Sequence, residues 1–141
     1  MRILAIETSC DETALSIIES NGNTNPTSFT VLANRVLSQI DMHKEYGGVF
    51  PAVAKREHAK AIVPLLHTTL SDAKLLETSS TTQEIPESFT TLFPQEPEIL
   101  EALPECLTWK KPEIDAIAVT SGPGLEPALW VGINFAKALS I

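Results

Sequence analysis

The sequence lacks the features that would place the protein in a membrane or outside the cell. It has only two cysteines, Cys10 and Cys106, too few for a disulfide framework and typical of a reducing compartment. No window approaches the roughly 18 uninterrupted apolar residues of a membrane span. The N-terminus also lacks the apolar core and small-residue cleavage site of a secretory signal. These absences predict a cytoplasmic protein with no membrane segment.

Positive charge is scarce as well. Ten Lys and Arg stand against 18 Asp and Glu, a net charge of −8, which by itself argues against a nucleic-acid partner. However, residues 77–112 hold seven glutamates and two lysines, a local charge of −5, which leaves −3 for the rest of the chain. The acidity therefore belongs mainly to one segment and does not decide the partner.

The 141 residues are enough for one ordinary domain. Apolar stretches at 2–7, 14–19 and 29–39 predict three strands, and the cluster of Asn, Gly and Pro from Asn21 to Pro26 predicts a hairpin turn. Three consecutive strands with hairpin links predict an antiparallel meander.

Helical periodicity begins after the meander. Residues 40–50 contain a Gly-Gly pair and little periodicity, so we predict a loop there. Apolar residues recur at helical spacing from Ala52 to about Lys74. Pro64 falls inside this pattern and predicts either a kink or a break between two helices.

The segment 77–112 contains five of the ten prolines and a Ser/Thr-rich start. We predict a mobile insertion, with a short helical turn around 98–103, and a docking arm as the alternative. A strand at 114–120, a Gly/Pro turn at 121–127 and a helix at 128–141 complete the α/β fold. The expected order is βββ-α-β-α, with the long Pro/Thr/Glu-rich insertion before the fourth strand.

The most specific stretch is IETSCDET, residues 6–13, between the first two strands. Backbone amides of a tight turn form an anion-binding nest, and the hydroxyls of Thr8, Ser9 and Thr13 are further donors for a phosphate. Asp11 or Glu12 could hold a phosphate-bound Mg²⁺ or accept a proton from a nucleophile. The alternative is an ordinary polar hairpin turn.

The stretch TSGPGL, residues 120–125, lies between a predicted strand and a predicted helix. Its two glycines allow close backbone approach, and the helix N-terminus favours an anion. It matches neither the GxGxxG pattern nor a P-loop. His43, His58 and His67 show no metal-ligand spacing, so the sequence predicts no metal site within these 141 residues.

Three stretches together resemble, in order and spacing, the N-terminal part of the TsaD family. They are ILAIETSCDETALSI, SQIDMHKEYGGVFPAVAKREHAKAIVPLL and IDAIAVTSGPGLEPALWVGINFAKALS. The resemblance implies the first RNase H-like lobe of an ASKHA (actin, sugar kinase, Hsp70-like) fold. It also implies transfer of threonylcarbamoyl from threonylcarbamoyl-AMP to N6 of the adenosine 3′ of the anticodon, in tRNAs that read codons starting with A.

The resemblance also implies roles for individual residues. Asp11 and Glu12 match acids important for activity. The nucleotide site would include Thr8, Ser9, Cys10 and Thr13. His43, Arg56 and His58 match positions with a role in tRNA binding or in structure, the last two within the family's REH motif. The implied partners are tRNA, threonylcarbamoyl-AMP, and TsaB-like and TsaE-like subunits.

The chain departs from the family in several respects. The family binds iron or zinc through a histidine pair and an aspartate that would follow residue 141, and Mg²⁺ with ATP is a further candidate cofactor. GPGLEPAL has Pro127 where the family has glycine. We therefore expect residues 1–141 to be a single, truncated lobe, inactive alone, whose second lobe a separate polypeptide could supply.

Three alternatives remain at this stage. A non-catalytic TsaB-like subunit would carry a G-P-G segment but not TSCDET or the REH motif. An ASKHA-type small-molecule kinase lobe would call for a glycine-containing DxGxT turn, which this sequence lacks. Cys10 as a protease nucleophile has no histidine beside it in sequence.

Overall fold

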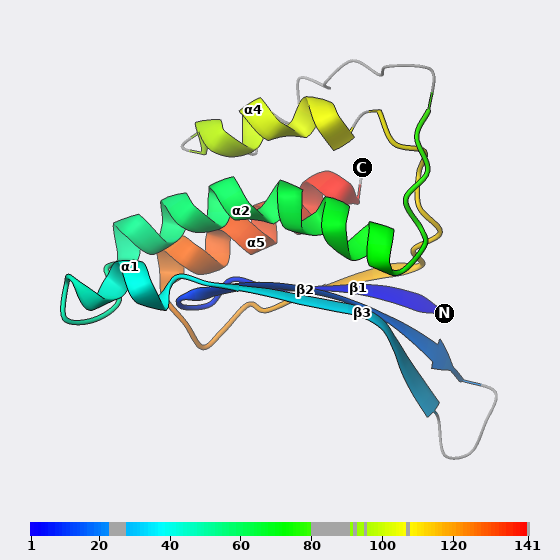
Figure 1. The fold of residues 1–141 in the computed structure, drawn as a ribbon, viewed down its shortest axis with the longest axis horizontal. Coiled ribbons are helices and arrows are strands. Elements are labelled where there is room, and N and C mark those ends of the chain that lie inside the picture. Colours follow the sequence, from blue (N-terminus) through cyan, green and yellow to red (C-terminus); the bar gives the residue numbers. More distant parts are fainter. Residues whose placement is uncertain (23–27, 80–90, 92, 95, 107, 141) are drawn as a thin grey trace.

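In the computed structural model, the described residues are 1–22, 28–79, 91, 93–94, 96–106 and 108–140, and they form a four-stranded sheet with helices stacked on one face (Figure 1). The elements in chain order are β1 (Arg2–Glu7), β2 (Glu12–Asn21), β3 (Ser28–Ser38), α1 (Ile40–Lys44), α2 (Pro51–Asp72), α4 (Pro97–Cys106), β4 (Ala116–Val119) and α5 (Glu126–Leu139). Among these residues, no helix has the length and apolarity needed to cross a bilayer.

The sheet has the strand order β3-β2-β1-β4. The first three strands pair antiparallel, which confirms the predicted meander, and β4 lies parallel to β1. Each strand is found close to its predicted range, although β2 is longer and β4 shorter than expected. The turn predicted at Asn21–Pro26 lies mostly outside the described residues. The result is a mixed α/β fold.

Alternation of apolar residues decides which face of the sheet is covered. Leu4, Ile6, Leu15 and Ile17 are buried, and they lie two residues apart on adjacent strands, so they share one face. Helices α2 and α5 cover this face, and α4 lies on their outer side (Figure 1). The core continues between the helices through Ile62, Val63, Leu66, Val131 and Phe135.

The structure corrects one prediction about the helices and excludes one of the two alternatives in another. Residues 40–44, predicted as part of a loop, form the short helix α1. Five residues are too few to display a period, and of this helix only His43 is buried. Of the kink or break predicted at Pro64, the break is excluded, because α2 runs continuously from Pro51 to Asp72, and the kink stays a prediction. Pro64 lies on the solvent-exposed side of α2. Its carbonyl accepts a hydrogen bond from the Thr68 hydroxyl at 3.0 Å.

The helical turn predicted near 98–103 is part of the ten-residue helix α4. Its buried residues Ile99 and Leu103 pack into the core together with Phe93 and Trp109, all from the segment 77–112. This segment therefore contributes to the hydrophobic core as well as to the surface. Residues 80–90 lie outside the described part, and the mobility of the segment stays a prediction.

Candidate functional site

The turn between β1 and β2, residues 8–11, is held from behind by three other parts of the chain. Successive carbonyls each accept one hydrogen bond: Ser9 from the Leu125 amide at 2.7 Å, Cys10 from His58 Nε2 at 3.1 Å, and Asp11 from the Gln39 amide at 2.8 Å. In a trans peptide, a carbonyl and the next N–H point in opposite directions. Each amide of residues 10–12 therefore points away from the donor bonded to the carbonyl before it, and the anion-binding nest stays a prediction.

Thr8 attaches the turn to helix α5. Its hydroxyl donates to the Ala128 carbonyl at 2.8 Å and accepts from the Gly132 amide at 3.2 Å, and the residue is fully buried. A Cβ on Gly132 would lie 2.6 Å from this hydroxyl, so the contact requires glycine. The first turns of α5 and the β1–β2 turn are thus fixed to each other.

The G-P-G segment approaches the same turn. A Cβ on Gly124 would lie 2.6 Å from the Ser9 carbonyl oxygen and 2.8 Å from the Ser9 Cβ. The backbone turns here so that Leu125, the residue before α5, can donate to Ser9. The two stretches that the sequence singles out, TSCDET and TSGPGL, therefore meet at one place.

Glu7, at the end of β1, contributes a carboxylate to this place. It accepts a hydrogen bond from the Ser9 amide at 2.5 Å. Burial acts to raise the pKa of Glu7, but hydrogen bonds from Ser9 and Thr120 outweigh it and lower the pKa overall, with a smaller contribution from His58. Glu7 is therefore ionised at neutral pH and serves to order the turn.

His58 lies beneath the turn in a chain of buried hydrogen bonds. The contacts in sequence are Phe50 N to His43 Nδ1 (3.4 Å), His43 Nε2 to Gln39 Oε1 (3.1 Å), Gln39 Nε2 to His58 Nδ1 (3.2 Å), Thr13 Oγ1 to His58 Nδ1 (2.7 Å) and His58 Nε2 to Cys10 O (3.1 Å). Carbonyl oxygens only accept, so His58 Nε2 carries the proton and Nδ1 accepts. The single lone pair of His58 Nδ1 is then shared between the Thr13 hydroxyl and the Gln39 amide.

The Cys10 thiol is not activated as a nucleophile. Burial first, and then the hydrogen bond and charge of Asp11, raise its pKa, which keeps the sulfur protonated at neutral pH. A nucleophilic cysteine needs the opposite shift. His58 contacts the Cys10 carbonyl, through Nε2. The role of Cys10 in nucleotide binding stays a prediction.

The sequence model of one family, described as TsaD: tRNA N6-adenosine threonylcarbamoyltransferase, matches residues 30–80 and 95–141. The chain belongs to the TsaD family. Curated relatives named tRNA N6-adenosine threonylcarbamoyltransferase include one from Dehalococcoides mccartyi strain BAV1, 39% identical over 140 residues. Others come from Staphylococcus epidermidis, 42% identical over 138 residues, and Staphylococcus saprophyticus, 43% identical over 138 residues. The family predicted from the motifs is therefore confirmed.

The alignments with these TsaD relatives include 98–99% of this chain but only 28–30% of each relative. The chain thus spans less than a third of the length of the curated relatives it matches. Within that part, the structure brings the TsaD stretches TSCDET, REH and GPGL into direct contact through Cys10–His58 and Ser9–Leu125.

Two of the predicted phosphate-binding hydroxyls serve the protein itself. Thr8 and Thr13 are both fully buried, bonded to α5 and to His58 respectively. A ligand at the turn would meet the backbone amides, together with Ser9, Asp11 and Glu12, of which Glu12 is exposed. The binding and catalytic roles of these residues stay predictions.

The REH motif divides between two environments. His58 is completely buried, whereas the Arg56 side chain is 57% exposed and pairs with Glu57 at 3.4 Å. Arg56 and Glu57 line an open pocket of about 350 Å³ between α1 and α2, beside Asp41, Met42, Glu45, Tyr46 and Val53. His43 is connected to His58 through Gln39, whereas Arg56 lies outside this set of hydrogen bonds.

Sequence reasoning missed Gln39 and gave Glu7 no role. Gln39 is 2% exposed, and it bonds His43, His58 and the Asp11 carbonyl. Its position one residue after β3, opposite the start of β2, was the available signal, because Glu12 pairs with Ser38. A single glutamine does not form a recognisable sequence motif. Its partners can be identified only from the folded structure.

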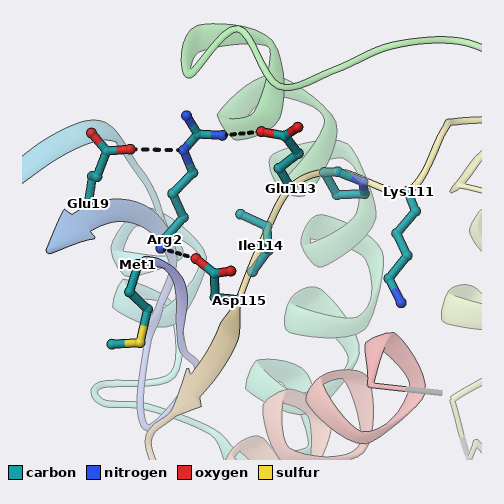
Figure 2. A pocket seen from close by; sticks show the side chains of 8 residues that line it. Met1, Arg2, Glu19, Lys111, Glu113, Ile114 and Asp115 are labelled. Atoms are coloured by element: carbon teal, nitrogen blue, oxygen red, sulfur yellow. Dashed lines mark hydrogen bonds and ion pairs between the residues drawn. The ribbon is translucent and has the colours of Figure 1, made fainter.

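A larger open pocket, about 590 Å³, lies at the other end of β1 (Figure 2). Figure 2 shows Arg2 between two acids, with Glu19 at 3.0 Å and Glu113 at 2.7 Å, while its amide donates to Asp115. The guanidinium is already paired with carboxylates, so it offers little to an anion. This pocket is separate from the β1–β2 turn.

Substitution of Gly124 by alanine is expected to destabilise the protein by about 2 kcal/mol, because the new methyl group overlaps the Ser9 backbone, which cannot move without losing its hydrogen bond. Gly48→Ala is the matched control, since a Cβ there has no neighbour within 4 Å. Urea unfolding of both variants measures the effect. Equal stability of the two variants would contradict the close approach.

Acidification is expected to destabilise the fold through His58. Burial is the main cause that lowers the pKa of His58 in the folded protein, while the unfolded value is about 6.5. Between these two values the unfolded state binds a proton that the folded state does not, so stability falls as the pH drops below about 6.5. Above that pH, His58 does not contribute to the change of folding stability with pH.

Urea midpoints at pH 7.5 and 5.5 test this expectation. The wild type and a His67→Gln control should both lose stability on acidification, and His58→Gln should lose less. His67 lies on the same helix, near the Trp109 ring at 5.5 Å between centroids. An identical loss of stability in all three proteins would show that His58 does not contribute to the pH dependence of stability.

Proposed function

We propose that this chain is the substrate-binding N-terminal lobe of a tRNA-modifying transferase, and that it is the first RNase H-like lobe of an ASKHA fold. The reaction would transfer threonylcarbamoyl from threonylcarbamoyl-AMP to N6 of the adenosine 3′ of the anticodon, in tRNAs that read codons starting with A. The names of the TsaD relatives support the acceptor and the group transferred.

The observation that supports the proposal is the β1–β2 turn. The carbonyls of Ser9, Cys10 and Asp11 each accept a hydrogen bond from another part of the chain, and in the proposal the amides of residues 10–12, beside Asp11 and Glu12, are left for a ligand. In the reaction, the adenosine N6 attacks the carbamoyl carbon, the bond from that carbon to the phosphate oxygen breaks, and AMP leaves. Outward amides would bind the phosphate as its charge develops. Asp11 or Glu12 would accept the proton that N6 loses, or hold Mg²⁺ on the phosphate.

The family resemblance also implies an iron or zinc ion. Across the described ranges, no group of three His, Cys, Asp or Glu side chains could hold one. The described residues of this chain therefore do not fit that metal. In the proposal its ligands belong to a second lobe, together with the other half of the nucleotide site.

The proposed setting is the cytoplasm, with tRNA and threonylcarbamoyl-AMP as substrates. TsaB-like and TsaE-like subunits and a polypeptide that carries the second lobe are the proposed protein partners. Residues 1–141 alone would bind but not catalyse. The net charge of −8 suits a lobe that leaves most phosphate contacts of the tRNA to other parts of the assembly.

A chimera tests the proposal. Residues 1–141 replace the aligned segment of the Staphylococcus epidermidis relative, with which they share 42% identity. The purified chimera receives threonylcarbamoyl-AMP and unmodified tRNA, and mass spectrometry measures the modified adenosine. Product formation is expected, and the relative without the segment is the blank. A folded chimera that makes no product while the intact relative does would contradict the proposal.

A further inference from the structure

Gln39 lies between His43 and His58 in the hydrogen bonds beneath the β1–β2 turn. Its side-chain oxygen accepts from His43 and its side-chain nitrogen donates to His58. Its backbone amide donates to the Asp11 carbonyl at 2.8 Å. Gln39 therefore contacts the turn directly at Asp11 and indirectly at Cys10, through His58.

The direction of these hydrogen bonds is determined from one end to the other. The Phe50 amide can only donate, so His43 Nδ1 accepts and His43 Nε2 is the donor to Gln39. This orients the glutamine amide with its nitrogen toward His58 Nδ1, which must then accept. The proton of His58 is left on Nε2, where it bonds the Cys10 carbonyl.

We propose that Gln39 is a positioning residue for the proposed transfer reaction, one that selects the neutral Nε2–H form of His58 and thereby keeps the Asp11 and Glu12 amides turned toward the substrate. This role rests on the proposed function of the turn. Gln39 itself, at 2% exposure, does not reach a ligand. The segment between α1 and α2 is linked to the turn by the same bonds, through Phe50 and His43.

Two substitutions separate positioning from packing. Gln39→Leu removes both side-chain contacts but keeps a similar volume. Gln39→Glu keeps the shape but replaces the donor by an acceptor, so His58 Nδ1 must acquire a proton to bond it. A nearby carboxylate also favours the charged imidazole. The other charged or titratable groups that act on His58 are Glu7, His43 and Asp11.

NMR of the 141-residue chain, labelled with ¹⁵N, reads both effects without a substrate. In the wild type at pH 7.5, His58 Nδ1 should appear unprotonated and Nε2 protonated. Gln39→Glu should move the Nδ1 signal to the protonated range, and Gln39→Leu should shift the amide signals of Cys10, Asp11 and Glu12. The control is Thr69→Ala, which removes a buried hydroxyl of α2 that bonds the Leu65 carbonyl.

Kinetics of the chimera give the second readout. Gln39→Leu should lower its kcat/KM about tenfold, below the hundredfold that a 1 Å misplacement of reacting groups can cost. Gln39→Glu should also shift the pH profile, and Thr69→Ala should do neither. If Gln39→Leu leaves His58 and the turn amides unchanged while it lowers stability as Thr69→Ala does, the positioning role is overturned and Gln39 only fills space. That result would not contradict the transferase proposal. An inactive chimera without these substitutions would contradict the transferase proposal, but it would not affect the NMR result.

Discussion

Asp11→Asn and Glu12→Gln in the chimera are each expected to lower the transfer rate by about a hundredfold or more, which is the contribution of a positioned acid or base. Both residues lie at the end of the turn whose amides face outward, and both are at least partly accessible. An amide keeps the shape of the side chain but neither accepts the N6 proton nor binds Mg²⁺ well. The loss should therefore appear in kcat more than in KM.

Asp41→Asn is the matched control for this prediction. Asp41 is an exposed acid of α1, and it pairs with Lys44 within the same helix at 2.6 Å. Removing its charge changes the net charge by the same amount as Asp11→Asn. Initial rates at saturating tRNA and threonylcarbamoyl-AMP measure kcat for the three variants. If Asp11→Asn and Glu12→Gln both retain the activity of Asp41→Asn, neither acid takes part in the chemistry.

The strands and long helices of this fold are predictable because each displays its period several times. β1 and β2 alternate, and α2 repeats its apolar residues over 22 positions. Of the kink or break predicted at Pro64, the break does not occur, because tertiary packing holds the helical turns on either side of this exposed proline. The helix α1 was missed because five residues cannot establish a period.

The location of the candidate site could be predicted from the sequence, but its hydrogen-bond network could not. TSCDET and TSGPGL stand out in sequence because hydroxyls, acids and glycines follow apolar runs. That Gln39 supports the turn depends on a contact with Asp11, 28 positions earlier in the chain, and His43 is connected to the turn only through Gln39. The division of Arg56 from His58 follows from the helix, where residues two apart point to different sides. Sequence adjacency suggested one role for both.

His58→Ala is expected to destabilise the 141-residue chain by about 4 kcal/mol. It leaves the Thr13 hydroxyl, the Gln39 amide and the Cys10 carbonyl without their partner, and each buried polar group left unpaired costs about 1–3 kcal/mol. The cavity adds to this cost, since His58 is fully buried. For a chain of this size, such a loss lowers the melting temperature by about 15 °C.

Calorimetry of His58→Ala beside His67→Ala tests this, because His67 is half-buried on the same helix and no hydrogen bond of its ring supports the turn. If His58→Ala does not fold at all, His58→Gln keeps a polar side chain at the position and should give a smaller, measurable loss. A double-mutant cycle with Thr13→Ala should show a coupling of about 1 kcal/mol or more, since the two side chains lie 2.7 Å apart. Additive losses would mean that Thr13 and His58 contribute to stability independently, despite their hydrogen bond.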